Sequence, residues 1–235
     1  MQMQAAILAG GQGTRMRPVT REPKALLPLG GRPLLAHQLD WLAALGFKDV
    51  FLCLGYGAER IKEVFGDGSA YGIKLRYSIE KEPRGTAGAA ADLKPEQDLL
   101  VLYGDLAVSF DGRGLIAAHE GKKAAATLLL RPTDHPEDSD LAELDGGGSI
   151  RWLGRLSGAP EPKGERLGCC AVWIVSARLL KRVPADRPSD FVKDLFRQAL
   201  ADGLPLCGHR IDGGVNDIGT PARYERFAKS FEARS

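Results

Sequence analysis

Apolar runs and amphipathic stretches alternate along the first half of the chain. Short apolar runs bounded by turn residues are typical of buried strands, whereas apolar residues that recur every three or four positions are typical of helices. Strands are predicted at 5–8, 49–54, 73–79, 98–103 and 124–130, and helices at 33–45, 58–65, 86–93 and 115–121. This alternation predicts an α/β fold, with a Rossmann-like, mostly parallel sheet and helices on both faces.

The second half of the chain has a less regular pattern. Residues 132–166 are rich in Pro, Gly and acidic side chains and contain two weak strand patterns, at 141–144 and 149–153. We predict that this segment is a small flap or lid over a site. Further strands are predicted at 167–175 and 206–211, and helices at 189–200, with Ser189 as N-cap, and at 221–231, with Pro221 first. No sharp linker is visible, so residues 1–235 are predicted to form one domain.

Composition narrows the class of protein. The 235 residues are 44% hydrophobic and 26% charged, which suits a single domain with a substantial core. The net charge of +2 gives no reason to expect nucleic acid or an acidic membrane as a partner. No apolar run is long enough to span a bilayer, and the N-terminus lacks the pattern of an export signal. The cysteines show no metal-binding spacing, so we expect reduced thiols and a cytoplasmic location.

The first strand runs directly into a glycine-rich loop that is followed by cations. Gly10, Gly11 and Gly13 would let backbone N–H groups approach phosphate oxygens, and Arg15 and Lys24 would neutralise their charge. The spacing fits neither a Rossmann fingerprint nor a Walker A loop. A glycine-rich hairpin turn is the alternative, but such a turn has no use for these cations. The loop therefore predicts a site for a triphosphate.

Two aspartates from distant parts of the sequence are candidate metal ligands. Asp105 follows the strand at 98–103 and one glycine, and Asp217 stands just before the last helix. Ligands of α/β sheets bind at the carboxyl ends of the strands, so Asp105 and the glycine loop are expected to share one site. Carboxylate oxygens suit Mg²⁺ beside substrate phosphates. Either aspartate alone could be a turn or cap residue, but together with the loop they predict one metal site.

A second glycine-containing turn, at 80–88, follows a predicted strand. Glu80 offers two acceptor oxygens, which match the two adjacent donors on the Watson–Crick edge of guanine. The small residues that follow would let a base or sugar lie against the backbone. A solvated charge cluster is the alternative, above all for Lys81 and Glu82. The four histidines share no motif, so no histidine base is predicted.

These motifs, taken in order, resemble the signature of the sugar-1-phosphate nucleotidylyltransferases over nearly the whole chain. The matching stretches are 8–15, 17–20, 23–28, 66–68, 82–89, 104–105 and 217–221. Within this family, residues 77–83 look most like the mannose-1-phosphate and D-glycero-D-manno-heptose-1-phosphate guanylyltransferases. The resemblance implies the nucleotide-diphospho-sugar transferase type of fold, in which a homo-oligomer is common.

The resemblance implies an enzyme of the EC 2.7.7 type. It would condense a nucleoside triphosphate, GTP in our interpretation, with a mannose-type or heptose-type sugar 1-phosphate and release pyrophosphate. Arg15 would face the triphosphate, Lys24 the phosphate under attack, and Asp105 and Asp217 would hold Mg²⁺. The nucleotide-binding residues that the resemblance implies are Leu8, Ala9, Gly10, Gly11, Gly13, Thr14, Glu80, Gly85 and Thr86.

The sequence departs from the family pattern in the half that would bind the acceptor. The family's Glu-Lys-Pro motif is missing, and Arg155 or Lys163 stands nearest to it. The family's Asn-Ala-Gly begins here with Cys169, and its sugar-binding glutamate falls at Val192. We predict Gly104, Cys169 and Arg155 as acceptor-binding residues. Two alternatives stay open: a transferase that uses UTP or CTP with another acceptor, such as N-acetylmuramate 1-phosphate or phosphocholine, and a non-catalytic regulator that binds nucleotide sugars.

Overall fold

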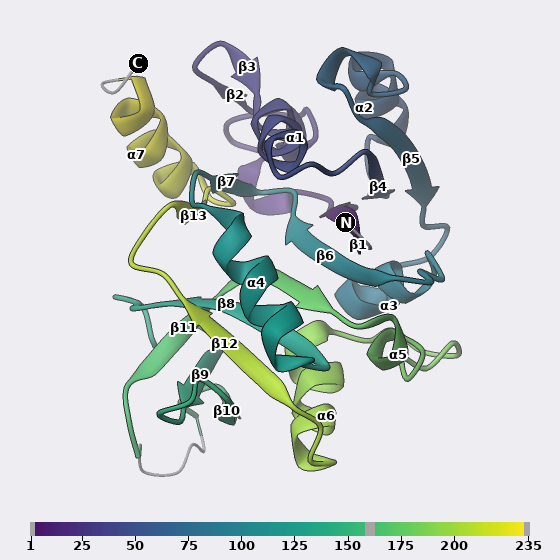
Figure 1. The fold of residues 1–235 in the computed structure, drawn as a ribbon. Helices are drawn as coiled ribbons and strands as arrows, with labels where there is room; N and C mark the ends of the chain where they lie inside the picture. Colours follow the sequence, from purple (N-terminus) through teal and green to yellow (C-terminus); the bar gives the residue numbers. More distant parts are fainter. Residues whose placement is uncertain (1–2, 158–162, 233–235) are drawn as a thin grey trace.

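The structure is a computed structural model, and it describes residues 3–157 and 163–232 (Figure 1). Strands and helices alternate through the first half, as the hydrophobic pattern predicts. They are β1 (Met3–Ala9), α1 (Leu34–Ala44), β4 (Asp49–Leu54), α2 (Ala58–Phe65), β5 (Lys74–Ile79), α3 (Gly85–Ala91), β6 (Asp98–Tyr103) and α4 (Gly112–Lys122). The second half contains β8 (Ala126–Arg131), β9 (Leu141–Leu144), β10 (Ile150–Gly154), β11 (Arg166–Val175), α5 (Ala177–Leu180), α6 (Arg197–Ala201), β12 (Leu206–Arg210) and α7 (Pro221–Glu232).

Several short elements complete the fold, and the sequence pattern did not predict most of them. They are η1 (Thr14–Met16), η2 (Lys24–Leu26), β2 (Pro28–Leu29), β3 (Arg32–Pro33), η3 (Ser69–Tyr71), β7 (Leu106–Val108), η4 (Phe191–Phe196) and β13 (Val215–Asp217). Elements of two or three residues carry no detectable hydrophobic period, which explains why the pattern misses them.

One mixed sheet organises the molecule. Its strand order is β10-β9-β11-β6-β1-β4-β5, with β8 beside β11 and β12 beside β8. Strands β6, β1, β4 and β5 run parallel, as do β8 and β12. Strand β11 is antiparallel to β6, β8 and β9, and β9 and β10 form an antiparallel hairpin. The predicted parallel sheet with helices is confirmed, and the structure adds an antiparallel half.

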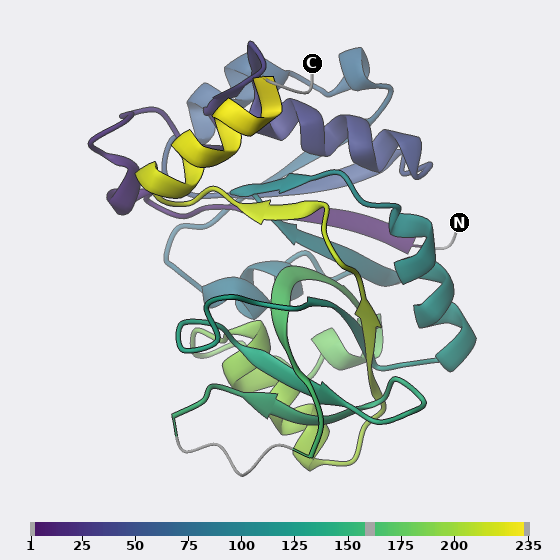
Figure 2. The same cartoon turned by 90° about the vertical axis from the view of Figure 1, so that its left-hand side faces the viewer.

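Helices cover both faces of the parallel strands, and each face has its own core. Along β1, Ala5 and Ile7 point into the core that α1, α2 and α4 complete, whereas Ala6 points into the core formed with α3, α5 and η4. Figure 2 shows α1 and α7 on one side of the sheet and the green helices on the other. Burial on both faces explains why inner strands such as β6 read as continuous apolar runs, whereas the edge strand β5 alternates.

The predicted flap contains the two predicted strands, and both belong to the main sheet. Strand β9 pairs with β11, and β10 extends the same edge. Residues 158–162 of the segment lie outside the described residues. A lid-like function of 132–166 stays a prediction.

The predicted cap of the helix at 189–200 is wrong. Asp190, not Ser189, accepts hydrogen bonds from the amides of Val192 and Lys193, and the helix begins as the π-helix η4. The physical reason is tertiary: the carbonyl of Ser189 accepts the amides of Ala87 and Gly88, at 2.9 and 3.2 Å. Ser189 therefore binds the first turn of α3, and the next residue, Asp190, caps η4.

Helix α7 packs against a third, small core of Leu29, Leu34, Ala107 and Ile218. Its half-buried aromatic residues face this core, and Phe231 lies against Gly30, where any Cβ would be 2.7 Å from the phenyl ring. The helix therefore holds β7 and β13 in place beneath it. None of the helices within the described residues is long and apolar enough to cross a membrane.

Candidate active site

The loops that follow β1, β5 and β6 meet at one edge of the sheet, because parallel strands place their carboxyl ends together. The glycine loop follows β1, Glu80 follows β5, and Gly104 and Asp105 follow β6. Gly104 is buried, and its amide donates to the carbonyl of Leu8 at 2.9 Å. A Cβ at Gly104 would lie 2.7 Å from the Cβ of Ala9, so only glycine lets the two chain ends approach this closely.

Lys24, Asp105 and Asp217 converge at this edge. The ammonium of Lys24 lies 2.5 Å from Oδ2 of Asp105, and the two side chains are about one-fifth exposed. A Cβ built on Gly219 would lie 2.8 Å from Oδ2 of Asp105, 2.9 Å from Oδ1 of Asp217 and 3.5 Å from Nζ of Lys24. One small region is therefore within reach of both carboxylates and of the ammonium group.

The short ladder between β7 and β13 brings the two aspartates together. Asp217 pairs with Leu106, the residue after Asp105, and the amide of Ile218 donates to the carbonyl of Asp105 at 3.0 Å. Asp217 also accepts the amide of Gly219 at 2.7 Å and pairs with Arg223 of α7. The predicted convergence of two aspartates distant in sequence thus has a defined structural cause.

The donor set suits a divalent cation with hard-oxygen preference. Mg²⁺ is commonly bound through one or two carboxylates together with substrate phosphates, rather than by a complete protein cage. Asp105 and Asp217 provide such a pair beside Gly219. Within the described residues no group of three or more His, Cys, Asp or Glu side chains could hold a metal.

The glycine loop lies over Lys24. Gly13 has a φ of +61°, a conformation that favours glycine, and its Cβ would approach Cγ of Lys24 to 3.2 Å. Thr14 and Arg15 follow in η1, and both are exposed. Arg15 makes no ion pair in the part of the chain that the structure describes. Gly11 faces open space. The backbone amides and a free guanidinium are thus available at the loop.

Glu80 follows β5, which is separated from β1 by β4, and it lies against the same loop. Its Oε1 accepts the amide of Arg84 at 3.1 Å, while Oε2 lies 2.9 Å from the position of a Cβ on Gly10. Gly85 has a φ of +73° and lies against Ser189, whose carbonyl oxygen would be 2.5 Å from an added Cβ. The structure thus places Glu80 beside Gly10, and Gly85 against Ser189.

Thr86 is used differently from the nucleotide contact that the resemblance implies. Its hydroxyl donates to Oδ2 of Asp190 at 3.0 Å and accepts the amide of Phe191 at 3.1 Å. Thr86 also bonds to Tyr103, at the end of β6. Burial raises the pKa of Tyr103 above its ordinary value, and the charges of Asp190, Asp105 and Asp140 act in the same direction. Tyr103 is thus close to Asp105 and also to Asp140 and Asp190.

Arg155 and Cys169 meet through Asp140. The guanidinium of Arg155 donates to Oδ1 of Asp140 at 2.9 Å. The amide of Cys169 donates to the backbone carbonyl of Asp140, also at 2.9 Å. The hydrogen bond to Asp140 raises the pKa of Arg155, and the charge of Asp190 contributes. Burial raises the pKa of the Cys169 thiol well above its usual range, so it is a neutral group here. Val192 is buried in the core.

Sequence reasoning missed several residues that shape the site: Arg84, Tyr103, Asp140, Asp190 and Arg223. Arg84, Tyr103, Asp140 and Asp190 act through partners that are distant in the sequence, whereas Arg223 pairs with Asp217, six residues away. Only Asp190 carried a local signal, because Asp at the start of an apolar helical stretch is a preferred N-cap.

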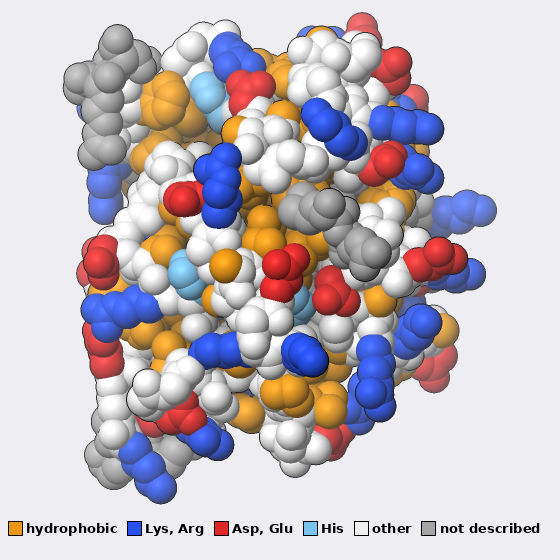
Figure 3. Space-filling model, in the orientation of Figure 1, with side chains coloured by type: hydrophobic (Ala, Val, Ile, Leu, Met, Phe, Trp, Pro, Cys, Tyr) orange, Lys and Arg blue, Asp and Glu red, His pale blue; other side chains and the backbone are white. Residues whose placement is uncertain are grey.

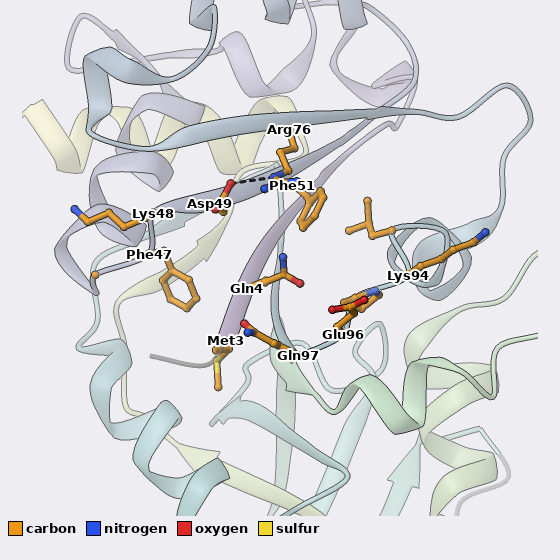
Figure 4. Close-up of a pocket in the computed structure, with 13 residues that line it drawn as sticks. Met3, Gln4, Phe47, Lys48, Asp49, Phe51, Arg76, Lys94, Glu96 and Gln97 are labelled. Carbon is orange, nitrogen blue, oxygen red and sulfur yellow. Dashed lines mark hydrogen bonds and ion pairs between the residues drawn. The ribbon is translucent and has the colours of Figure 1, made fainter.

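A hollow of about 550 Å³ lies at the opposite edge of the sheet and is shown in Figure 4. It is lined by the first residues of β1, β4 and β5 and by residues 93–97. Its charged groups have both signs, and Arg76 and Asp49 already form an ion pair at 2.9 Å. This hollow is separate from the glycine loop and takes no part in the site described above.

Comparisons with known proteins agree with this geometry. The nucleotidyl transferase family matches residues 4–234. The mannose-1-phosphate guanylyltransferase of Mycobacterium tuberculosis is 31% identical over 232 residues, which cover 96% of this chain and 63% of that protein. The UTP–glucose-1-phosphate uridylyltransferase of Synechocystis sp. is 28% identical over 239 residues, which cover 94% and 61% of the two chains. The chain thus spans about three fifths of the length of these curated relatives.

A solved structure supports the fold. A candidate glucose-1-phosphate thymidylyltransferase from Bacillus anthracis, in complex with sucrose, superposes with a TM-score of 0.84 and 24% identity, over 97% of this chain and 95% of that one. The likeness confirms the nucleotide-diphospho-sugar transferase type of fold. Together with the family match over residues 4–234, it confirms the resemblance inferred from the motifs, and the chain belongs to the nucleotidyl transferase family.

Proposed function

We propose that the chain catalyses the transfer of a nucleotidyl group from a nucleoside triphosphate to a sugar 1-phosphate, with release of pyrophosphate. One observation carries the proposal: Lys24, Asp105 and Asp217 converge beside the glycine loop at the carboxyl edge of the parallel strands. Nucleotidyl transfer between phosphates needs positioning and charge neutralisation rather than a covalent intermediate. An ammonium group, two carboxylates and free loop amides supply those functions.

The roles of the residues follow from their positions. The amides of the glycine loop would hold the triphosphate, and Arg15, which is exposed and unpaired among the described residues, would meet the leaving pyrophosphate. Lys24 would leave Asp105 and neutralise the phosphate under attack. Asp105 and Asp217 would hold Mg²⁺, which when bound neutralises charge on the phosphate oxygens.

For the base we propose guanine. Oε2 of Glu80 makes no hydrogen bond within the described residues, and it faces Gly10 beside the loop. A free carboxylate oxygen next to a fixed one can accept both donors of the guanine edge. The guanylyltransferase relative supports this choice, although the uridylyltransferase relative is nearly as similar. Uracil lacks the amino group that guanine presents, so Glu80 should discriminate between the two bases.

For the acceptor we propose a sugar 1-phosphate of the mannose or heptose class, held by Arg155. Arg155 and the amide of Cys169 both donate hydrogen bonds to Asp140, and the ion pair with Asp140 keeps Arg155 on the acceptor side. Cys169 offers only a weakly polar thiol and Val192 an apolar side chain. Sugar hydroxyls therefore have fewer hydrogen-bond partners here than the family pattern provides. A cytoplasmic location and a homo-oligomer belong to the same proposal.

A pyrophosphate-release assay tests the proposal. The purified chain is incubated with Mg²⁺, each of GTP, UTP, CTP and dTTP, and a panel of sugar 1-phosphates that includes mannose 1-phosphate. Release with GTP and a sugar 1-phosphate is the expected result. Release only with UTP or CTP and another acceptor would refute the assignment of the base. Nucleotide binding without release for any pair would refute the transferase and favour a non-catalytic regulator.

A further inference from the structure

A second hollow, of about 520 Å³, lies beside the turn at 80–88, which carries Glu80 and is called the nucleotide-binding loop below. It is a groove between α5 on one side and η4 and α6 on the other, closed by residues 182–189. Its floor is apolar, with Leu179, Val183 and Leu195 among the lining residues. Its size falls in the range of small-molecule sites, roughly 300–1,000 Å³.

The charged residues of this basic groove are almost all cations. Arg182, Arg187, Lys193 and Arg197 line it, against a single acid, Asp194. Figure 3 shows Lys and Arg side chains gathered over the part of the surface where Figure 1 places α5 and α6. The hollow at the opposite sheet edge differs in this respect, because Lys48, Arg76 and Lys94 are opposed there by Asp49 and Glu96. Of these two hollows, the basic groove alone has a strong preference for one sign of charge.

Most of these cations have no acid to neutralise them. Arg182 pairs with Asp202, but Arg187, Lys193 and Arg197 form no ion pair within residues 3–157 and 163–232. Asp194 is engaged with the backbone, because its Oδ2 accepts the amide of Asp190 at 2.6 Å. Three free cations around a partly apolar hollow create a positive potential that favours an anion with a non-polar part.

The wall of the groove is the same segment that fixes the nucleotide-binding loop. Arg84 donates through Nη1 to the carbonyl of Arg187 at 2.9 Å and through Nη2 to the carbonyl of Pro184 at 3.0 Å. The amide of Ser189 donates to the carbonyl of Arg84 at 2.8 Å, and the amide of Arg84 donates to Glu80. A continuous set of hydrogen bonds thus runs from the groove to the glutamate proposed to read the base.

We propose that the basic groove is a second anion-binding site, which takes a phosphorylated small molecule and stiffens the loop that carries Glu80. The anion would bind between Arg187, Lys193 and Arg197, and its non-polar part would cover the apolar floor. Ordering of residues 184–189 would then be transmitted through Arg84. The site is independent of which triphosphate the enzyme uses, and its test does not need turnover.

Inorganic tripolyphosphate is a suitable probe, and its binding is measured by calorimetry at constant ionic strength without Mg²⁺. An Arg15→Ala/Lys24→Ala background weakens binding at the glycine loop, so that binding at the groove can be observed. We expect saturable binding of one tripolyphosphate. Adding Arg187→Gln, Lys193→Gln and Arg197→Gln should weaken it by about tenfold or more, since three charge-assisted contacts are removed.

The matched control carries Lys74→Gln, Arg113→Gln and Lys229→Gln, three exposed cations outside the groove, in the same background. It changes the net charge equally and should bind tripolyphosphate as tightly as the background protein. Absence of saturable binding, or equal weakening in both triple variants, would overturn the proposal. Circular dichroism of each variant shows whether it is folded.

Hydrogen exchange then tests the connection to the nucleotide loop. In the same background, tripolyphosphate should slow the exchange of the amides of Ala87, Gly88 and Ser189. The first two donate to the carbonyl of Ser189, and the third donates to the carbonyl of Arg84. Protection limited to residues around Lys193 and Arg197 would contradict the coupling.

Discussion

Replacement of Asp105 by Asn separates a catalytic role of this carboxylate from a structural one. The substitution keeps the shape of the side chain and its ability to accept a hydrogen bond from Lys24, now 2.5 Å away. It removes the negative charge that opposes the ammonium group and would bind Mg²⁺. The pair is about one-fifth exposed, and in the variant Lys24 keeps a hydrogen-bond acceptor, so the loss of stability should be measurable but smaller than the loss of turnover.

The expected magnitudes differ widely. Exposed ion pairs contribute at most about 1 kcal/mol, and removing one partner of a fully buried pair costs about 3–5 kcal/mol. A partly exposed pair that keeps its hydrogen bond should lie between these limits, at about 1–2 kcal/mol, which for a chain of this size corresponds to roughly 2–8 °C in melting temperature. Loss of one preorganised electrostatic group in an active site costs on the order of 10²–10³ in turnover, or about 3–4 kcal/mol. Asp105→Asn should therefore abolish most of the activity of a protein that remains folded.

The assay measures pyrophosphate release at saturating substrates over a range of Mg²⁺ concentrations, alongside thermal unfolding. Asp49→Asn is the matched control, because it removes an ion pair, with Arg76 at 2.9 Å, at the opposite edge of the sheet. That variant should keep full turnover. Activity of Asp105→Asn within twofold of the unchanged protein would refute the reasoning. So would a melting temperature lower by more than about 10 °C, since the carboxylate would then be needed for the fold.

Three further predictions concern single positions. Gly10→Ala places a Cβ 2.9 Å from Oε2 of Glu80, so the KM for the triphosphate should rise about tenfold with little change in melting temperature; an unchanged KM would contradict the role of Glu80. Ala171 has a φ of +54° inside β11, so Ala171→Gly should raise the free energy of unfolding in urea by about 0.5–1 kcal/mol, and a destabilised variant would show that the side chain's packing outweighs the strain. Burial lowers the pKa of His209, which means that the folded state favours the neutral ring. Its contribution to stability is present above the unfolded pKa of about 6.5 and is lost as the pH falls through the lower, folded value. His209→Gln should therefore reduce the difference in unfolding free energy between pH 7.5 and pH 5.5, and an unchanged difference would disprove this origin.

The sequence predicted the parallel half of the sheet well, because its inner strands are largely buried on both faces and its edge strand β5 alternates between buried and exposed positions. A short, continuous apolar run such as 98–103 is typical of a strand that is buried on both faces. The antiparallel half was harder to predict. Strand β11 contains Ala171 with a positive φ and a register shift between Cys169 and Trp173, features that depend on the neighbouring strands.

The candidate site divides in the same way. The glycine loop, Lys24 and Asp105 follow directly from local sequence, since glycines and cations after a strand have a clear chemical use. The partners of these groups cannot be predicted from local sequence. Asp217 reaches Asp105 through two strands of three residues each, which are too short to leave a hydrophobic period.

By itself the sequence determined where the main strands and helices form and that a glycine-rich loop with cations follows the first strand, because these properties depend on neighbours along the chain. The tertiary structure decided that Asp190 caps the helix in place of Ser189, that Asp140 holds Arg155, and that unpaired cations line a groove behind Arg84. Those outcomes depend on hydrogen bonds and charges between residues far apart in the sequence. Only the packing of the sheet and its helices brings such groups within reach of one another.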